Sequence, residues 1–241
     1  MIGYALWDQA WADLPDAVRR FARREDVTRV CELGGGANPI LDLAFIERHG
    51  LHYEVLDASE EELAKAPPGY TRAVADATDP TLADRHGPYD LVASGFVAEH
   101  VSDPAAFHAT VHALLRPGGH AVHLFPTLYE PVFLVNLLIP EALTDRALAR
   151  VQPGREAHGS HAKFRPYYRW CRGPGVRQFQ RLESIGFEVM DYRGYFGHGY
   201  FRRFPALDRL EQRGARVLVR HPLPALASYA RVILRRPEDS S

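Results

Sequence analysis

The chain has few of the residues that build cross-linked or membrane-spanning proteins. Only two of its 241 residues are cysteines, Cys31 and Cys171, too few for a disulfide framework or a cysteine-based zinc site. The longest apolar run, Val132 to Ile139, contains Asn136 and is far shorter than the roughly 20 residues that cross a bilayer. The N-terminal segment lacks the basic and apolar regions of a signal peptide. We therefore expect a cytoplasmic protein without a transmembrane segment.

Charge is almost balanced over the whole chain but not along it. The formal net charge is −1, which argues against a nucleic-acid partner. Residues 1–145 hold 10 basic and 22 acidic residues, a balance of −12, whereas residues 146–241 hold 19 basic and 8 acidic residues, a balance of +11. This asymmetry has two interpretations: an anionic partner of the second half, or neutralisation of one half by the other across an internal interface.

Strand-like and helical segments alternate along most of the chain. Seven segments rich in apolar residues are predicted strands: 29–33, 52–57, 71–77, 89–94, 120–126, 187–195 and 226–236. Amphipathic helical spacing separates most of them. Such alternation is typical of a doubly wound sheet. We therefore predict an α/β fold with a seven-stranded, mostly parallel sheet.

The rhythm divides the chain into an N-terminal helical region, a core, an insert and a C-terminal region, at 1–28, 29–126, 127–175 and 176–241. The first region is expected to form two short helices, divided at Pro15, over the ligand site. The insert carries no clear strand, and we expect a helical or irregular lid, because long loops inside compact domains are usually functional. The C-terminal region completes the sheet, and its irregular stretch 196–224 would face the substrate.

Three consecutive glycines, 34–36, follow the first predicted strand. In open parallel sheets, ligands bind beyond the carboxyl ends of the strands, where the strand order reverses. A bare backbone lets a ligand approach closely, and the helix that follows offers unpaired N–H groups. Asp57, at the end of the second predicted strand, is placed to accept hydrogen bonds from both hydroxyls of a ribose. The pattern therefore indicates a ligand that contains a nucleoside.

Two residues around the glycines discriminate between nucleoside ligands. A dinucleotide site needs the pattern G-x-G-x-x-G or A, but Pro39 stands at the last position. Glu32 directly precedes the glycine segment and is poorly placed beside a doubly anionic pyrophosphate. It suits a ligand with a cationic end, such as S-adenosylmethionine, which has an ammonium and a sulfonium and no phosphate. An NAD(P)-dependent oxidoreductase is the alternative.

These segments are collinear with the motifs of a known family. ELGGG resembles the first motif, E/D-x-G-x-G, of the class I (Rossmann-like) S-adenosylmethionine-dependent methyltransferases, although Asn38 stands where the fuller motif has a third glycine. LDAS resembles the end of their second strand, and ADAT their adenine-contacting turn. YDLVASGFVAEHV and LLRPGGHAVHLFP resemble their fourth-strand segment and the turn into the fifth strand. The resemblance covers residues 29–126 and implies the same fold, cofactor and activity.

The resemblance also implies which residues contact the cofactor: Glu32, Gly34, Gly35, Gly36, Asp57, Ala58, Asp76, Ala77, Ser94 and Gly95. Glu32 and the glycine backbone would hold the methionine part, and Asp57 the ribose, with Ala58 beside the adenine. Asp76 would accept a hydrogen bond from the adenine amino group. Ala77 would add a backbone contact there, while Ser94 and Gly95 would lie near the sulfonium. For the two aspartates, the alternative role is capping of the following turn.

Histidines are the candidate general bases, because an oxygen or nitrogen acceptor must lose a proton. His100, in AEHV, lies next to the expected methyl position and is the first candidate, unless it only orients its loop. His158 and His161 lie in the insert, and His198 lies between two glycines. The spacing of His158 and His161 does not predict a metal site, since no carboxylate or further histidine pattern accompanies them.

Aromatic residues and arginines gather in the insert and the C-terminal region. The aromatic residues would wall an apolar acceptor or form the core of a small cap, and the arginines would pair with an anionic acceptor or remain solvated. We predict a methyltransferase that acts on an oxygen of a small molecule, such as a specialised metabolite or a sugar-containing precursor. An RNA methyltransferase that uses the basic half is a further alternative. A homo-oligomer is compatible with the sequence.

Overall fold

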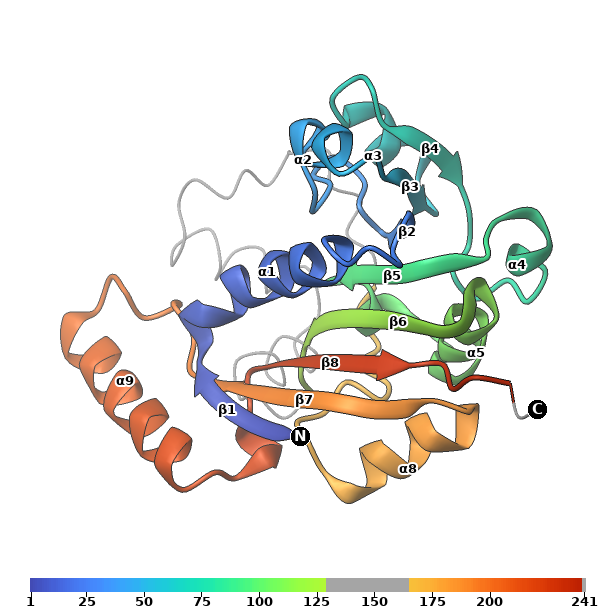
Figure 1. The fold of residues 1–241 in the computed structure, drawn as a ribbon. Helices are drawn as coiled ribbons and strands as arrows, with labels where there is room; N and C mark the ends of the chain where they lie inside the picture. The colour runs from blue at the N-terminus through green and yellow to red at the C-terminus, as the bar shows by residue number, and fades with distance from the viewer. Residues whose placement is uncertain (129–164, 240–241) are drawn as a thin grey trace.

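An eight-stranded sheet forms the centre of the computed structural model, which describes residues 1–128 and 165–239 (Figure 1). Its strands are β1 (Ile2–Leu6), β2 (Arg29–Leu33), β3 (His52–Asp57), β4 (Thr71–Val74), β5 (Tyr89–Gly95), β6 (Leu115–Pro126), β7 (Glu188–Phe196) and β8 (Tyr229–Arg235). They lie in the order β1-β7-β8-β6-β5-β2-β3-β4. Only β8 runs antiparallel to its neighbours, β6 and β7. The predicted mostly parallel α/β sheet is confirmed, with one strand more than expected.

The additional strand is β1, in the region for which only helices were expected. It pairs parallel to β7, with Tyr4 opposite Gly194, and of its five residues only Ala5 is buried. A single helix, α1 (Ala10–Ala22), then runs through Pro15, so the predicted division into two helices is wrong. The helix survives because its buried residues, which include Leu14 and Val18, pack on the sheet.

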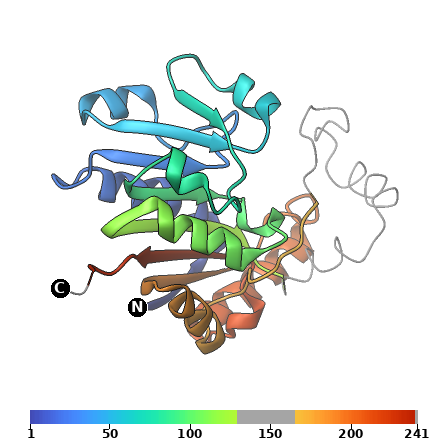
Figure 2. The same cartoon turned by 90° about the vertical axis from the view of Figure 1, so that its right-hand side faces the viewer.

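Helices cover both faces of the sheet (Figures 1 and 2). They are α1, α2 (Leu43–Arg48), α3 (Glu60–Lys65), α4 (Leu82–Arg85), α5 (Pro104–Leu114), α8 (Val176–Ile185) and α9 (Pro205–Arg220). α1 packs over β5, β6 and β8, while α5 packs on the opposite face and contacts α4 and α8. Between these layers the side chains of Val30, Leu91 and Val122 are fully buried. Within the described ranges, no helix combines the length and the hydropathy needed to span a membrane.

The stretch 196–224, which was predicted to be irregular, contains the 16-residue helix α9. This helix lies beyond the edge strand β1 (Figure 1) and packs Ala215 and Leu218 against Phe196 and Tyr4. The predicted lid lies mostly at 129–164, outside the described residues.

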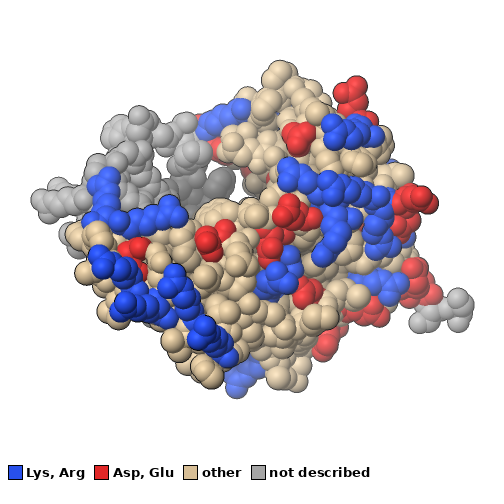
Figure 3. Space-filling view, turned by 60° about the vertical axis from the view of Figure 1, so that its left-hand side comes forward, with Lys and Arg blue, Asp and Glu red and all other residues tan. Residues whose placement is uncertain are grey.

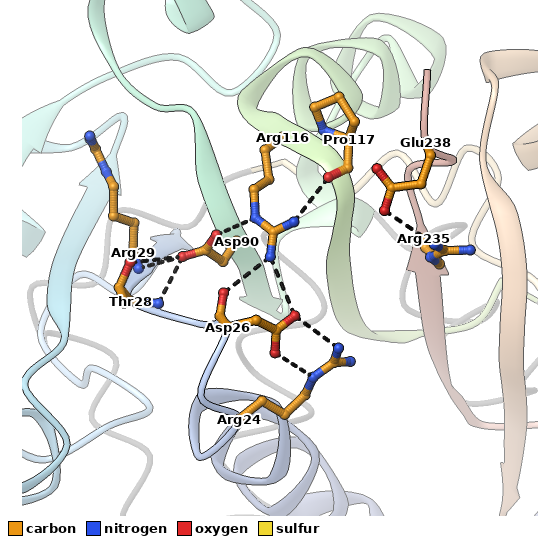
Figure 4. A network of polar contacts seen from close by, with 9 residues as sticks. All are labelled: Arg24, Asp26, Thr28, Arg29, Asp90, Arg116, Pro117, Arg235 and Glu238. Atoms are coloured by element: carbon orange, nitrogen blue, oxygen red, sulfur yellow. Dashed lines mark hydrogen bonds and ion pairs between the residues drawn. The ribbon is translucent and has the colours of Figure 1, made fainter. Parts of the chain in front are cut away.

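At the amino ends of the parallel strands, a polar network centres on Asp90 (Figure 4). Its carboxylate accepts hydrogen bonds from the backbone N–H groups of Thr28 and Arg29, both at 2.8 Å, and from Nε of Arg116. Arg116 also donates to the carbonyl of Asp26 at 3.1 Å. Burial raises the pKa of Asp90, but the hydrogen bonds from Thr28 and Arg116 outweigh it, so that the pKa lies below its ordinary value. The network ties the starts of β2, β5 and β6 together and leaves the carboxyl ends for ligands.

Candidate cofactor and acceptor site

The glycine loop leaves β2 in a conformation that only glycine adopts easily. Gly34 has a φ of +73°, and Gly36 has a φ of +39°. The N–H of Gly34 donates to the carbonyl of Leu56 in β3 at 2.7 Å. A Cβ atom added at Gly34 would stand 2.1 Å from Cγ2 of Val97, far inside van der Waals contact. The loop is therefore fixed both by backbone conformation and by packing.

Glu32 supports this loop from inside the sheet. Its side chain is only 2% exposed, and its Oε2 accepts hydrogen bonds from N–H of Ile40, at 2.9 Å, and from the hydroxyl of Tyr53. A Cβ atom at Gly35 would stand 2.7 Å from Cδ of Glu32. Burial raises the pKa of Glu32 to about 7. The carboxyl group thus holds the far end of the loop, and its predicted contact with the methionine part stays a prediction.

Asp57 lies at the carboxyl end of β3, directly beside the glycine loop. Its Oδ1 accepts a hydrogen bond from N–H of Ser59 at 2.8 Å, and a Cβ atom at Gly36 would stand 3.2 Å from its Oδ2. Burial raises the pKa of this carboxyl, while the contact with Ser59 lowers it. Ala58, the next residue, is exposed. The sequence-based expectation that an acidic acceptor and a bare backbone lie together is therefore matched by the geometry.

Asp76 and Ala77 lie in the turn that follows β4. Asp76 is exposed, and its Oδ1 accepts hydrogen bonds from the backbone N–H and the hydroxyl of Thr78, at 2.8 and 2.7 Å. This is the turn-capping role that the sequence left open as the alternative. The adenine contacts of both residues stay predictions.

The end of β5 is covered by the N-terminal helix. Ser94 turns its side chain into the core, where its Oγ lies 2.7 Å from Nδ1 of His123, so only its backbone is available to a ligand. A Cβ atom at Gly95 would stand 2.8 Å from Cδ2 of Leu14 in α1. Phe96 follows with a φ of +60°, a strained conformation for a side chain of this size, and its ring stacks on Trp11 with centroids 4.8 Å apart.

A buried carboxyl group that sequence reasoning missed lies next to His100. Glu99, in the short 3-10 helix Ala98–His100, is 4% exposed, and burial raises its pKa to about 8. Its Oε1 lies 3.8 Å from Nε2 of His100, and its Oε2 has no hydrogen-bond partner among the described residues. The carbonyl of Glu99 accepts from the N–H groups of Tyr167 and Tyr168, at 2.6 and 3.0 Å. The only signal in the sequence was an acidic residue beside the histidine in AEH.

Among the described residues, the other candidate base, His198, does not lie beside His100. His198 follows β7, which is separated from β5 by β8 and β6, a distance of about three strand spacings of ~4.8 Å each. Its ring is 5% exposed and accepts a hydrogen bond at Nδ1 from N–H of Tyr200, at 3.3 Å. Burial lowers the pKa of His198. His158 and His161 lie outside the described residues.

Several aromatic residues of the insert and the C-terminal region belong to the core. Tyr192, Tyr195 and Phe196 of β7 are fully buried, and Tyr168 is 5% exposed. Their burial shows that they stabilise the sheet.

The chain matches known methyltransferases in sequence and in fold. Residues 6–189 match the model of the family described as a methyltransferase domain. A structure of an S-adenosylmethionine-dependent methyltransferase from Mesorhizobium loti superposes with a TM-score of 0.54 at 21% identity, covering 91% of this chain and 96% of that one. The structure of the [4+2]-cyclase SpnF superposes with a TM-score of 0.56 at 18% identity, covering 98% and 84%.

Two curated relatives carry a more specific name. A ubiquinone biosynthesis O-methyltransferase of Caulobacter sp. (strain K31) is 31% identical over 121 residues, which are 41% of this chain and 47% of that protein. The match thus spans about half the length of that relative.

The family model and the fold identify a Rossmann-like, S-adenosylmethionine-dependent methyltransferase, and the glycine loop with Asp57 is its candidate cofactor site. Since the family model covers most of the chain, the protein belongs to the family of methyltransferase domains. The predicted fold, enzyme class and cofactor are confirmed, and the oxidoreductase alternative is set aside. The residues fit the cofactor, because the carboxyl of Asp57 lies beside the bare backbone of Gly36, where an added Cβ would stand 3.2 Å from its Oδ2.

Proposed function

We propose that the protein methylates an oxygen atom of a small-molecule acceptor. When bound, S-adenosylmethionine supplies an electrophilic methyl group on its sulfonium. Gly34, Gly36 and Asp57 would hold the cofactor, and the chain would align the acceptor and remove its proton. The name of the Caulobacter relative supports an oxygen acceptor. Alignment alone contributes much of the acceleration in such displacements, about 7–11 kcal/mol.

The observation that carries this proposal is the Glu99–His100 pair just beyond β5. A hydroxyl acceptor releases a proton as its oxygen is methylated, and Nε2 of His100 would receive it. The new imidazolium would lie 3.8 Å from the carboxyl of Glu99, which stabilises a cation when it is ionised. Because burial raises the pKa of Glu99 to about 8, a neighbouring positive charge is what favours its ionised form. The two groups would therefore share the proton as a coupled pair.

A groove beside the start of α5 supports an anionic group on the acceptor. It has a volume of about 290 Å³ and is lined by Arg169, Arg172, Arg181, Trp170, Pro104, Ala105 and one acidic residue, Asp103. Oδ1 of Asp103 accepts hydrogen bonds from the N–H groups that begin α5. Arg169 donates to the carbonyl of Ser102 at 2.8 Å, two residues beyond His100. Guanidinium groups gathered in one groove favour a carboxylate or a phosphate.

The acceptor can be found by offering a methyl-labelled donor to a metabolite extract and to RNA, and reading which product gains the label. The His100→Asn variant should lower kcat by about 10²–10⁴-fold while leaving cofactor affinity unchanged. His52→Asn, which alters an exposed histidine at the start of β3, is the matched control. Unchanged kcat in His100→Asn would remove the base role. Label in RNA alone would replace the small-molecule acceptor with RNA, the alternative that the basic second half favours.

A further inference from the structure

The outer face of α9 carries two rows of exposed side chains. At about 3.6 residues per turn, Leu207, Leu210 and Val217 form one row, with exposed fractions of 42%, 66% and 57%. The adjacent row consists of Arg209, Arg213, Arg216 and Arg220, all exposed. Figure 3 shows basic side chains following one another along the side of the molecule where α9 lies.

The inner face of α9 contacts the rest of the protein. Ala215 is buried against the sheet. Both acidic residues of the helix bond within the protein: Oε1 of Glu211 accepts from N–H of His198 at 2.9 Å, and Oδ2 of Asp208 accepts from Gln212 at 2.6 Å. In the described part of the chain, the four outer arginines form no ion pair, and Arg209 donates only to the carbonyl of Pro205. The outer face therefore presents positive charge without a carboxylate.

Exposed apolar residues also flank the helix in the sequence. Phe204 precedes it with 52% of its surface exposed, and Leu223 and Leu226 follow with 56% and 40%. A monomeric protein rarely leaves this many large apolar side chains together in water unless they bind something.

We propose that α9 docks the protein on an anionic lipid surface. An apolar row beside an arginine row is the pattern of helices that lie in the membrane interface, with the apolar side chains at the acyl boundary and the arginines on lipid phosphates. A nucleic acid would neutralise the arginines but leave the apolar row in water. An exposed helix can meet a flat lipid surface along its whole length, whereas a protein partner would need a matching groove. This inference goes beyond methyl transfer and does not depend on it.

Flotation of the full chain with vesicles tests the proposal. We expect binding to vesicles of equal parts phosphatidylcholine and phosphatidylglycerol, weakening with added salt, and little binding to phosphatidylcholine alone. The double variant Arg213→Glu/Arg220→Glu should bind at least about tenfold more weakly. Leu210→Ser/Val217→Ser should also lose binding. The matched control Arg20→Glu/Arg48→Glu changes exposed arginines on α1 and α2 by the same charge and should bind as the unaltered chain does.

The proposal would be overturned by no binding to the anionic vesicles, by equal loss in the two arginine double variants, or by equal binding to both kinds of vesicle. RNA binding that depends on the arginines but not on Leu210 and Val217 would also overturn it, in favour of a nucleic acid. Circular dichroism melting and cofactor affinity of each variant check that it is folded. If Arg213→Glu/Arg220→Glu melts early, Arg216→Gln, with a smaller expected loss, takes its place.

Discussion

Asp57 serves two roles at the end of β3, since it holds the following turn and faces the glycine loop. Asp57→Asn keeps an oxygen for the N–H of Ser59 but removes the charge that a ribose diol would use. We expect cofactor affinity, measured by calorimetry, to fall by about tenfold to a hundredfold, since hydrogen bonds to charged groups contribute about 1.5–3 kcal/mol. Glu60→Gln, an exposed neighbour, is the control. Unchanged affinity would leave Asp57 with the capping role alone.

Glu99 gives the stability of the protein a particular dependence on pH. Its pKa is raised to about 8 in the folded state, and that of Glu32 to about 7. Their contributions to the free energy of unfolding are therefore fully present below the unfolded pKa of about 4.3 and are lost as the pH rises through the folded pKa values. The contribution of the buried His108 to stability changes with pH in the opposite direction, because burial lowers its pKa to about 4. Its contribution is present above about pH 6.5 and is lost in acid, so the range from pH 6.5 to 8 isolates the two carboxyls.

In that range we expect the free energy of unfolding to fall with pH and the Glu99→Gln variant to flatten the decline. Each group contributes at most about 1.4 kcal/mol per pH unit. Urea titrations at several pH values measure this slope. Glu47→Gln, at an exposed position of α2, should leave it unchanged. If Glu99→Gln showed the same slope as the unaltered chain, the carboxyl of Glu99 would not be neutral in the folded protein.

At the scale of turns and helices, the same substitution can be compared at two glycines, Gly34 in the loop and Gly214 in α9. Gly34→Ala places a Cβ 2.1 Å from Val97 at a φ of +73°, whereas Gly214 lies inside α9 with nothing within 4 Å of an added Cβ. We expect Gly214→Ala to raise the free energy of unfolding by about 0.5–1 kcal/mol. Gly34→Ala should lower it by more than about 1 kcal/mol and weaken cofactor binding. Thermal melting with and without S-adenosylmethionine separates the two. Full cofactor affinity in Gly34→Ala would show that the loop is not the binding element.

Local pattern predicted β2 and β3 within their observed bounds, because each is a short apolar run that ends at a turn residue. It missed β1, since only one of that strand's residues is buried and its pairing depends on β7 at the other end of the chain. It missed α9, although the helix is amphipathic and begins at a proline, the residue favoured at the first helical position.

The candidate site was likewise predictable from the sequence only in part. Adjacency of Asp57 and the glycines followed from the rule that parallel strands end at one edge. The burial of Glu99 and the contact of Ser94 with His123 arise from packing between distant segments, which no local pattern records.

Across the molecule, the charge imbalance between the two halves is only partly neutralised. Arg193 and Arg231, from the basic half, lie 2.8 and 3.6 Å from the carboxylate of Asp13 in α1. These contacts support the interpretation that one half neutralises the other. The arginines on the outer face of α9 have no such partners within the described residues, so the two interpretations of the asymmetry apply to different surfaces of one molecule.

Effects on stability and on cofactor binding should also be separable by experiment. The Asp90 network lies at the amino ends of the strands, whereas the cofactor would bind at their carboxyl ends. Asp90→Asn weakens contacts to Thr28, Arg29 and Arg116, and we expect the free energy of unfolding to fall by about 1.5–3 kcal/mol. Since the pKa of Asp90 is lowered, this contribution is present above an unfolded pKa of about 3.9 and is lost as the pH falls through the folded value. The variant should therefore differ least from the unaltered chain in strong acid.

Cofactor affinity of Asp90→Asn, measured where the variant is fully folded, should remain within about twofold of the unaltered value, a difference of less than ~0.5 kcal/mol. The control Asp16→Asn removes only an exposed carboxylate 3.9 Å from Arg19 and should change stability by less than about 0.5 kcal/mol. A large loss of affinity in Asp90→Asn would show that the amino edge controls the position of the glycine loop. In that case β2 would connect the network to the loop, because it starts at Arg29 in the network and ends directly before Gly34.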